Sequence, residues 1–303
     1  MMMKNLNKLI LSCALILSSP TVLAELNVFA CEPEWKALVD ELGREQVKSY
    51  SATSAFQDPH HIEARPSLIS KVRNADLLIC SGAELEAAWL PLLIRQAANG
   101  DVLPGKDGYF EASSFIERLD VKQHVDRSMG DVHGAGNPHV HLDPRRITKI
   151  AAALSQRLIK LDPANTSLYQ QYHADFKQRW LVAIDRWQQQ ALPLKGIAIV
   201  VHHKDWVYLF DWLGIKLAGA LEPKPGLPTT IGHLVTLKNS LKEKPAAMIV
   251  HTTYQNTRAA NRLAELTGLP VVELPYTVGG DVLATDLFSL FDVTISKLLE
   301  VNK

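Results

Sequence analysis

Histidine is the residue type that offers this chain its clearest chemistry. Of the 11 histidines in 303 residues, six lie in three short segments, 58–61, 137–141 and 201–203. These six are His60, His61, His139, His141, His202 and His203. A fourth segment, 278–281, ends in Asp281, a carboxylate. Imidazole nitrogens together with a carboxylate are typical ligands of zinc, and they can also bind other first-row transition metals. We therefore predict a metal site, although the spacing does not say which histidine of each pair is the ligand.

The elements around these segments indicate where the site lies. Short apolar runs alternate with helical patterns, which is typical of parallel sheets covered by helices on both faces. The expected strands are Leu26–Ala30, Gln46–Ser49, Ala75–Cys80, Asp101–Leu103, Gly196–Val201, Lys216–Gly219, Ala246–Val250 and Pro270–Leu274. The expected helices include Pro33–Leu42, Ser67–Asn74, Glu84–Ala98 and Arg258–Thr267. Ligands of such sheets bind beyond the carboxyl ends of the strands, so the four segments are expected to meet there.

The middle of the chain has helical spacing and no strand signal. Apolar residues recur at intervals of three and four from Ile147 to Leu161 and again from Tyr169 to Trp187. The second stretch is about 28 residues, or roughly 40 Å as a helix. We expect an α/β protein of two similar lobes, 25–143 and 193–303, each with a mostly parallel four-stranded sheet. The helices of 144–192 join them as one long rigid connector, unless they pack on a single lobe.

The first 24 residues have the pattern of a cleaved signal peptide. Lys4 and Lys8 precede a short apolar run, and small residues lead to Ala24. We therefore expect an exported, periplasmic protein without a membrane anchor. Lys+Arg and Asp+Glu are balanced at 32 each, and this argues against a nucleic-acid partner.

Two cysteines remain after the expected cleavage. Cys31 and Cys80 each follow an apolar, strand-like run, so both are expected at the same edge of one parallel sheet. In an oxidising compartment they could form a disulfide. The alternative is two buried free thiols that pack as small apolar residues.

The histidine segments resemble the motifs of a known family. Asp58-Pro59-His60, Asn137-Pro138-His139-Val140-His141 and His203 with Tyr208 are similar to the motifs of the zinc and manganese solute-binding proteins of ABC importers (cluster A-I). The resemblance covers essentially the whole chain after the signal peptide. It implies a monomeric carrier that binds a metal ion as cargo and delivers it to an ABC permease in the inner membrane.

The resemblance implies His60, His139 and His203 as metal ligands, with His61, His141 and His202 beside them as auxiliary groups. The fourth ligand is less defined, because the stretch after the last expected strand has no acid before Asp281. Asp281 is therefore our expected fourth ligand. The alternatives are Asp286 (which could instead begin the last helix), Glu222 (otherwise an auxiliary group) and a water molecule.

A loop of the expected N-terminal lobe carries two further histidines. Residues 121–138 contain several glycines, few apolar side chains, and His124 and His133. The loop resembles a short form of the histidine-rich segment of zinc-type members, which implies weak capture of zinc before it moves inward. The alternative is a solvated loop with incidental histidines. Glu84 and Glu86 are expected on a solvated helix face.

Three functions compete for this pattern. A zinc carrier is favoured, because three histidines and at most one carboxylate suit zinc better than manganese, the alternative cargo. A zinc hydrolase would need an open coordination position, and the chain has neither a His-Glu-x-x-His pair nor a Gly-x-Ser-x-Gly motif. The third candidate function is that of a metal-dependent adhesin. We therefore expect a protein that is not an enzyme.

Overall fold

The computed structural model describes residues 25–302 apart from 126–129 and 131. The predicted signal peptide lies outside the described residues. No helix among the residues that are described has the length and the apolar character needed to cross a membrane.

The first half of the described chain contains a four-stranded parallel sheet of order β2-β1-β3-β4. The strands are β1 (Leu26–Ala30), β2 (Val47–Ser51), β3 (Leu77–Cys80) and β4 (Tyr109–Glu111). The helices α1 (Pro33–Gly43), α2 (Pro66–Arg73) and α3 (Leu90–Ala97) accompany them. All four residues of β3 are buried, as expected for a central strand covered on both faces.

The second half repeats the arrangement as a parallel sheet of order β6-β5-β7-β8. Its strands are β5 (Ala198–Val201), β6 (Lys216–Ala220), β7 (Met248–Thr252) and β8 (Val271–Leu274). Its helices are α6 (Val207–Leu213), α7 (Ile231–Glu243), α8 (Arg258–Thr267) and α9 (Leu287–Val301). The predicted pair of similar α/β lobes is confirmed, whereas the domain boundaries at 143 and 192 stay predictions.

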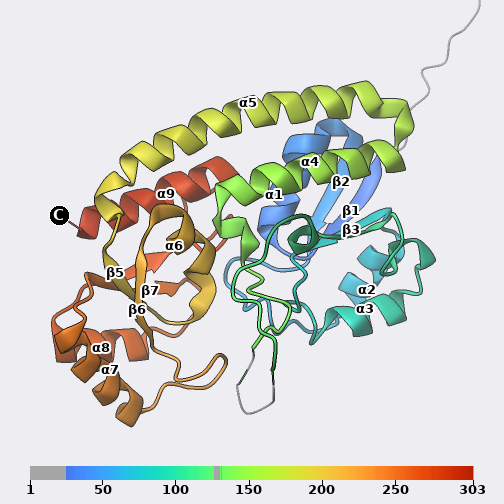
Figure 1. The fold of residues 1–303 in the computed structure, drawn as a ribbon. Coiled ribbons are helices and arrows are strands. Elements are labelled where there is room, and N and C mark those ends of the chain that lie inside the picture. The colour runs from blue at the N-terminus through green and yellow to red at the C-terminus, as the bar shows by residue number, and fades with distance from the viewer. Residues whose placement is uncertain (1–24, 126–129, 131, 303) are drawn as a thin grey trace, which may run out of the picture.

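Two long helices join the lobes. α4 (Pro144–Leu161) is followed by α5 (Thr166–Gln190), a helix of 25 residues or about 37 Å. Figure 1 shows α5 running over both lobes, and it packs against α1 on one side and α9 on the other. Trp180 donates to the carbonyl of Pro144 at 2.8 Å, and Trp187 donates to Asp292 on α9 at 2.6 Å. The predicted rigid connector is confirmed.

A single apolar cluster extends through both lobes. It includes Val28 and Leu77 from the first sheet, and Ile199 and Val250 from the second. Trp187 of α5 belongs to the same cluster, with its ring 5.0 Å from that of Phe291 on α9. Because moving one lobe against the other would break this packing, the core resists a wide hinge motion.

Two local predictions were wrong. Asp101–Leu103 is not a strand: Gly100–Val102 forms a 3-10 turn, in which the side chain of Asn99 accepts from the Asp101 amide, and β4 supplies the edge strand instead. The helix expected from Glu84 begins only at Leu90. Ala83 and Glu84 adopt positive φ angles of 48° and 70°, a left-handed conformation that a right-handed helix cannot include.

Cys31 and Cys80 form a disulfide between the carboxyl ends of β1 and β3, with their Cα atoms 4.9 Å apart. The alternative of two free thiols is therefore wrong. Their sulfur atoms also lie close to the carboxylate of Glu86. Thiolates are the metal ligands that cysteine provides, and the disulfide removes them, so we assign no metal to this group.

Glu86 is buried at 3% exposure, against the expectation of a solvated helix face. Its carboxylate accepts from the backbone amides of Ser81 and Gly82 at 2.8 and 3.1 Å. Burial raises its pKa to about 7. Burial also raises the pKa of the adjacent Glu32 well above its usual range, and the charges of Glu86 and Glu34 add to this rise.

This buried carboxyl pair should make folding stability depend on pH. The folded protein holds a proton on Glu86 more tightly than the unfolded chain does. Its contribution is therefore fully present below pH 4.5 and is lost as the pH rises through about 7. Between pH 5 and 8 the native protein should lose about 2 kcal/mol more unfolding free energy than the Glu86→Gln variant. Urea unfolding at both pH values measures this, with the exposed Glu84→Gln as control. An equal pH dependence in the native protein and Glu86→Gln would contradict the assignment.

Candidate metal centre

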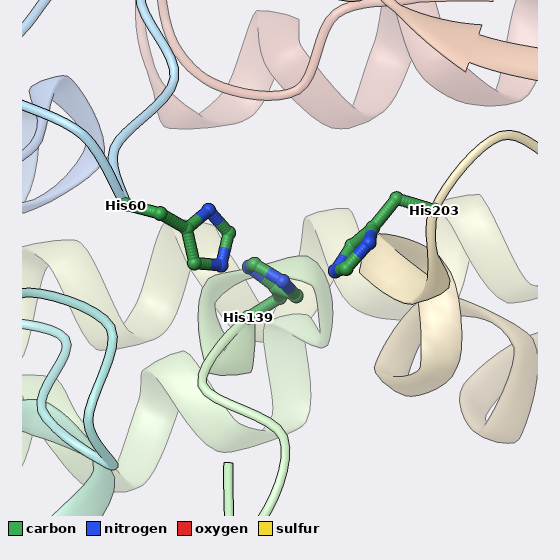
Figure 2. A group of neighbouring side chains, drawn as sticks. All are labelled: His60, His139 and His203. Atoms are coloured by element: carbon green, nitrogen blue, oxygen red, sulfur yellow. The ribbon is translucent and has the colours of Figure 1, made fainter. Parts of the chain in front are cut away.

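Three histidines meet between the lobes. His60 comes from the loop between β2 and α2, His139 precedes the 3-10 turn η5 (Val140–Leu142), and His203 follows β5. Each offers a ring nitrogen, and these three atoms all lie within 4.8 Å of one another. Figure 2 shows the three rings turned toward a common point. The segments that the sequence singled out therefore converge, as expected for loops at the carboxyl edges of two parallel sheets.

Each of the three rings is held through its Nδ1 atom. His60 Nδ1 lies 2.7 Å from Asp58, and the Asp58 carboxylate also accepts from the His60 amide at 3.0 Å. His203 Nδ1 lies 2.6 Å from Glu222. His139 Nδ1 lies 2.7 Å from the Tyr276 hydroxyl. Metal-binding histidines are oriented in this way by a partner on the second nitrogen, which leaves Nε2 for the ion.

Among the three histidines, the Nε2 atom of His139 gives the strongest indication of a bound ion. It is buried and has no hydrogen-bond partner among the described residues, in a side chain that is 0% exposed. A buried polar nitrogen without a partner is costly, unless something absent from the protein chain binds it. Burial lowers the pKa of His139 well below its usual range, with a further contribution from the neighbouring imidazoles. The ring is therefore neutral, which is the form that binds metal.

His203 has the opposite electrostatic setting. Burial lowers its pKa, but the carboxylates of Asp205 and Glu222 outweigh burial and raise it to about 9. His203 is thus protonated at neutral pH in the metal-free protein. A cation that binds its Nε2 must displace that proton.

Asp205 lies at the site although no sequence motif indicated it. It is fully buried, and its Oδ1 lies 3.5 Å from His139 Nε2. Gln255 donates to its other oxygen at 3.0 Å, and the Tyr254 hydroxyl lies 3.4 Å from Oδ1. Only its place two residues after His203 could have indicated it. Tyr276, which lies in the stretch where we looked for an acid, was missed as the partner of His139.

The structure does not bring Asp281 to the three histidines. Its carboxylate pairs with Lys297 on α9 at 2.7 Å and accepts from the Leu283 amide at 2.9 Å. The hydrogen bond from Lys297 lowers the pKa of Asp281. Asp286 caps α9 by accepting from the Ser289 amide. Glu222, the third candidate, holds the His203 ring.

The predicted auxiliary histidines differ in their surroundings. His61 is exposed. His141 is buried, with Nε2 2.9 Å from the Tyr276 carbonyl and Nδ1 3.1 Å from Glu34. His202 lines a cavity together with His60 and His203. His141 thus braces the segment around Tyr276, while His202 borders the site.

The two histidines of the loop 121–138 lie in different surroundings. His124 is exposed, next to residues outside the described ranges. His133 reaches the centre, where its Nε2 lies 3.2 Å from Nε2 of His60. Burial lowers the pKa of His133 to about 4, and the nearby His60 and His203 contribute.

Comparison with known proteins identifies the family of this chain. Residues 28–300 match the family model described as zinc-uptake complex component A, periplasmic (ZnuA). The chain belongs to the ZnuA family. Its relatives include the manganese ABC transporter substrate-binding lipoprotein PsaA of Streptococcus pneumoniae, which is 22% identical over 88% of this chain and 85% of PsaA. The metal ABC transporter substrate-binding lipoprotein SloC of Streptococcus mutans is 25% identical over 91% and 90%.

Solved structures of ZnuA-like proteins share the fold. A crystal structure of ZnuA superposes with a TM-score of 0.77 at 21% identity, covering 92% of this chain and all of that one. A manganese-bound periplasmic metal-binding protein from Candidatus Liberibacter asiaticus gives 0.74 at 16% identity, with coverages of 92% and 100%. This ZnuA-family chain is therefore a substrate-binding protein of a metal ABC transporter, a class that transports a solute together with a membrane permease.

Proposed function

We propose that this protein binds Zn²⁺ as its cargo at His60, His139 and His203, and that it delivers the ion to an ABC permease in the inner membrane. It acts as a monomer in the periplasm, after removal of its signal peptide. The observation that carries this proposal is the buried Nε2 of His139, which faces two other imidazoles and has no hydrogen-bond partner among the residues that the structure describes.

The chemistry of the ligand atoms supports zinc over manganese. Among the described residues, the group within 4.8 Å contains three imidazole nitrogens and no carboxylate oxygen. Imidazole suits zinc, whereas manganese favours carboxylates, carbonyls and water. The carboxylates of Asp58 and Glu222 are turned to the Nδ1 atoms of His60 and His203. There they raise the basicity of the ligands and offset the charge of the ion.

Manganese is the second candidate, because several relatives carry it in their names. A competition experiment separates the two ions. The mature protein should bind one zinc ion, and a chelating dye should report a zinc affinity at least about 1,000-fold above that for manganese. Isothermal calorimetry gives the stoichiometry. Comparable affinities for both ions would remove the zinc assignment, and no tight binding of either would remove the carrier proposal.

A further inference from the structure

A second group of side chains that can bind metal lies at the carboxyl ends of β1 and β3, separate from the three histidines. It consists of Cys31, Cys80 and Glu86, whose two sulfur atoms and one carboxylate oxygen all lie within 4.8 Å of one another. Cys31 follows β1, Cys80 ends β3, and Glu86 lies in the turn after β3. All three side chains are buried. The fold, and not a local motif, therefore brings these donors together.

Glu32 adds a second buried carboxyl group to this cluster. It is hydrogen-bonded to Glu86, and its side chain is only 1% exposed. Its Oε1 atom is buried and has no hydrogen-bond partner among the described residues. Two carboxyl groups in contact away from water cannot both be charged at low cost, so such a pair holds a shared proton or a cation.

We propose that Cys31, Cys80 and Glu86 bind a second zinc ion when the disulfide is open, with Glu32 Oε1 at the fourth position. The disulfide offers no thiolate, so this site exists only in the dithiol form, which every newly made chain has before oxidation. Two thiolates and two carboxylates leave a net charge of about −2 around the ion, the same as in a common four-cysteine zinc site.

The backbone keeps the two cysteines side by side whether or not their sulfur atoms are bonded. The Cys31 amide donates to the carbonyl of Ile79 at 2.8 Å, which continues the parallel pairing of β1 and β3. Zinc–sulfur bonds of about 2.3 Å in a tetrahedron place two sulfur atoms about 3.8 Å apart. Because the Cα atoms are 4.9 Å apart, the sulfur atoms reach that spacing through side-chain rotation.

The turn after β3 holds the Glu86 carboxylate against the sulfur atoms. The amides of Ser81 and Gly82 donate to it at 2.8 and 3.1 Å. These donors fix the orientation of Glu86 and offset part of the negative charge of the ligands, as outer partners do in metal sites. Glu32 lies one hydrogen bond further out, so its side chain has to rotate toward the sulfur atoms when the ion binds.

The chemistry of the dithiol form balances with a phosphine as the reductant. The phosphine supplies two electrons and becomes its oxide, water supplies the oxygen and two protons, and the disulfide becomes two thiols. Zn²⁺ then displaces both thiol protons and the proton that the carboxyl pair holds, and these protons pass to the solvent.

Refolding with a spectroscopic probe tests the proposal. The full mature protein is unfolded in urea with or without the phosphine and is refolded with Co²⁺ or Zn²⁺, because the donors are buried in the folded protein. Reduced protein should bind one equivalent more than oxidised protein. Only the reduced Co²⁺ form should show a thiolate-to-cobalt charge-transfer band, which imidazole nitrogens cannot produce. The band is therefore independent of the proposed cargo site.

Variants separate the four donors from their surroundings. Cys31→Ala should abolish the band, and Glu86→Gln should weaken zinc binding at the second site about 100-fold, the loss expected for one of four ligands. Glu84→Gln is the matched control, because Glu84 is exposed in the same turn. It should bind as the native protein does, and His60→Ala should keep the band. Circular dichroism checks that each variant is folded.

Three results would overturn the proposal. Reduced, folded protein that binds no additional equivalent and shows no band lacks the site. Equal weakening in Glu86→Gln and Glu84→Gln would show that the two thiols bind the ion without the carboxylate. Reduced protein that stays unfolded when zinc is present would also contradict the proposal, because an ion bound only by the folded form stabilises that form.

Discussion

Replacing His60 by alanine should weaken zinc binding roughly 100-fold, whereas the same change at His61 should leave it nearly intact. The two residues are neighbours in one loop, but only His60 directs a nitrogen to the cluster, and His61 is exposed. Structural zinc sites contribute about 10–16 kcal/mol from four ligands. One ligand is then worth about 3 kcal/mol, or roughly a 100-fold loss of affinity. Chelator competition measures both variants.

His139→Ala and His203→Ala extend the same experiment. Each should lose affinity to a similar extent as His60→Ala, because each removes one nitrogen of the group of three. The melting temperature of the metal-free variants, compared with the metal-free native protein, separates lost coordination from lost folding. Zinc affinity that falls equally in the His60 and His61 variants would refute the ligand assignment.

Loss of the disulfide should be the largest single change in folding stability considered for this chain. Cys31 and Cys80 are 49 residues apart in the sequence. In the chain-entropy model, a link that closes a loop of this length removes about 4 kcal/mol of conformational freedom from the unfolded state. The Cys31→Ala/Cys80→Ala double variant should therefore unfold with about 4 kcal/mol less free energy, as measured in urea.

The single variants provide the control for the cross-link. Either replacement alone breaks the bond, so Cys31→Ala and Cys80→Ala should each lose nearly as much as the double variant. Losses that add from the two singles to the double would indicate two independent packing effects and contradict the cross-link explanation. Zinc affinity should stay close to native throughout, because the cysteines and the three histidines belong to separate groups among the described residues.

Local patterns were sufficient where the chain's own periodicity decides the structure. β1 and α8 have the predicted bounds, because an apolar run or a helical spacing between clear breakers fixes them. The convergence of His60, His139 and His203 also followed from sequence. Parallel strands bring the loops at their carboxyl ends together, whatever the loops contain.

The features that could not be predicted from the sequence depend on contacts between residues far apart in the chain. Asp281 looked like a ligand until folding placed Lys297 of α9 against it. Glu86 sits among residues that favour helices, so nothing local predicted the left-handed turn at Ala83 and Glu84. The choice between His124 and His133 depends on the path of a loop, and loop paths have no periodic pattern from which they can be read.

The connector α5 has a consequence for how the protein tells one metal from another. Because α5 is packed on both lobes within one continuous core, we expect the spacing of the lobes to change little from one bound ion to another. A carrier of this kind does not select ions by their size. It distinguishes one metal ion from another by how strongly each binds the imidazole nitrogens. Other ions that, like zinc, prefer nitrogen ligands are therefore expected to compete for the three histidines.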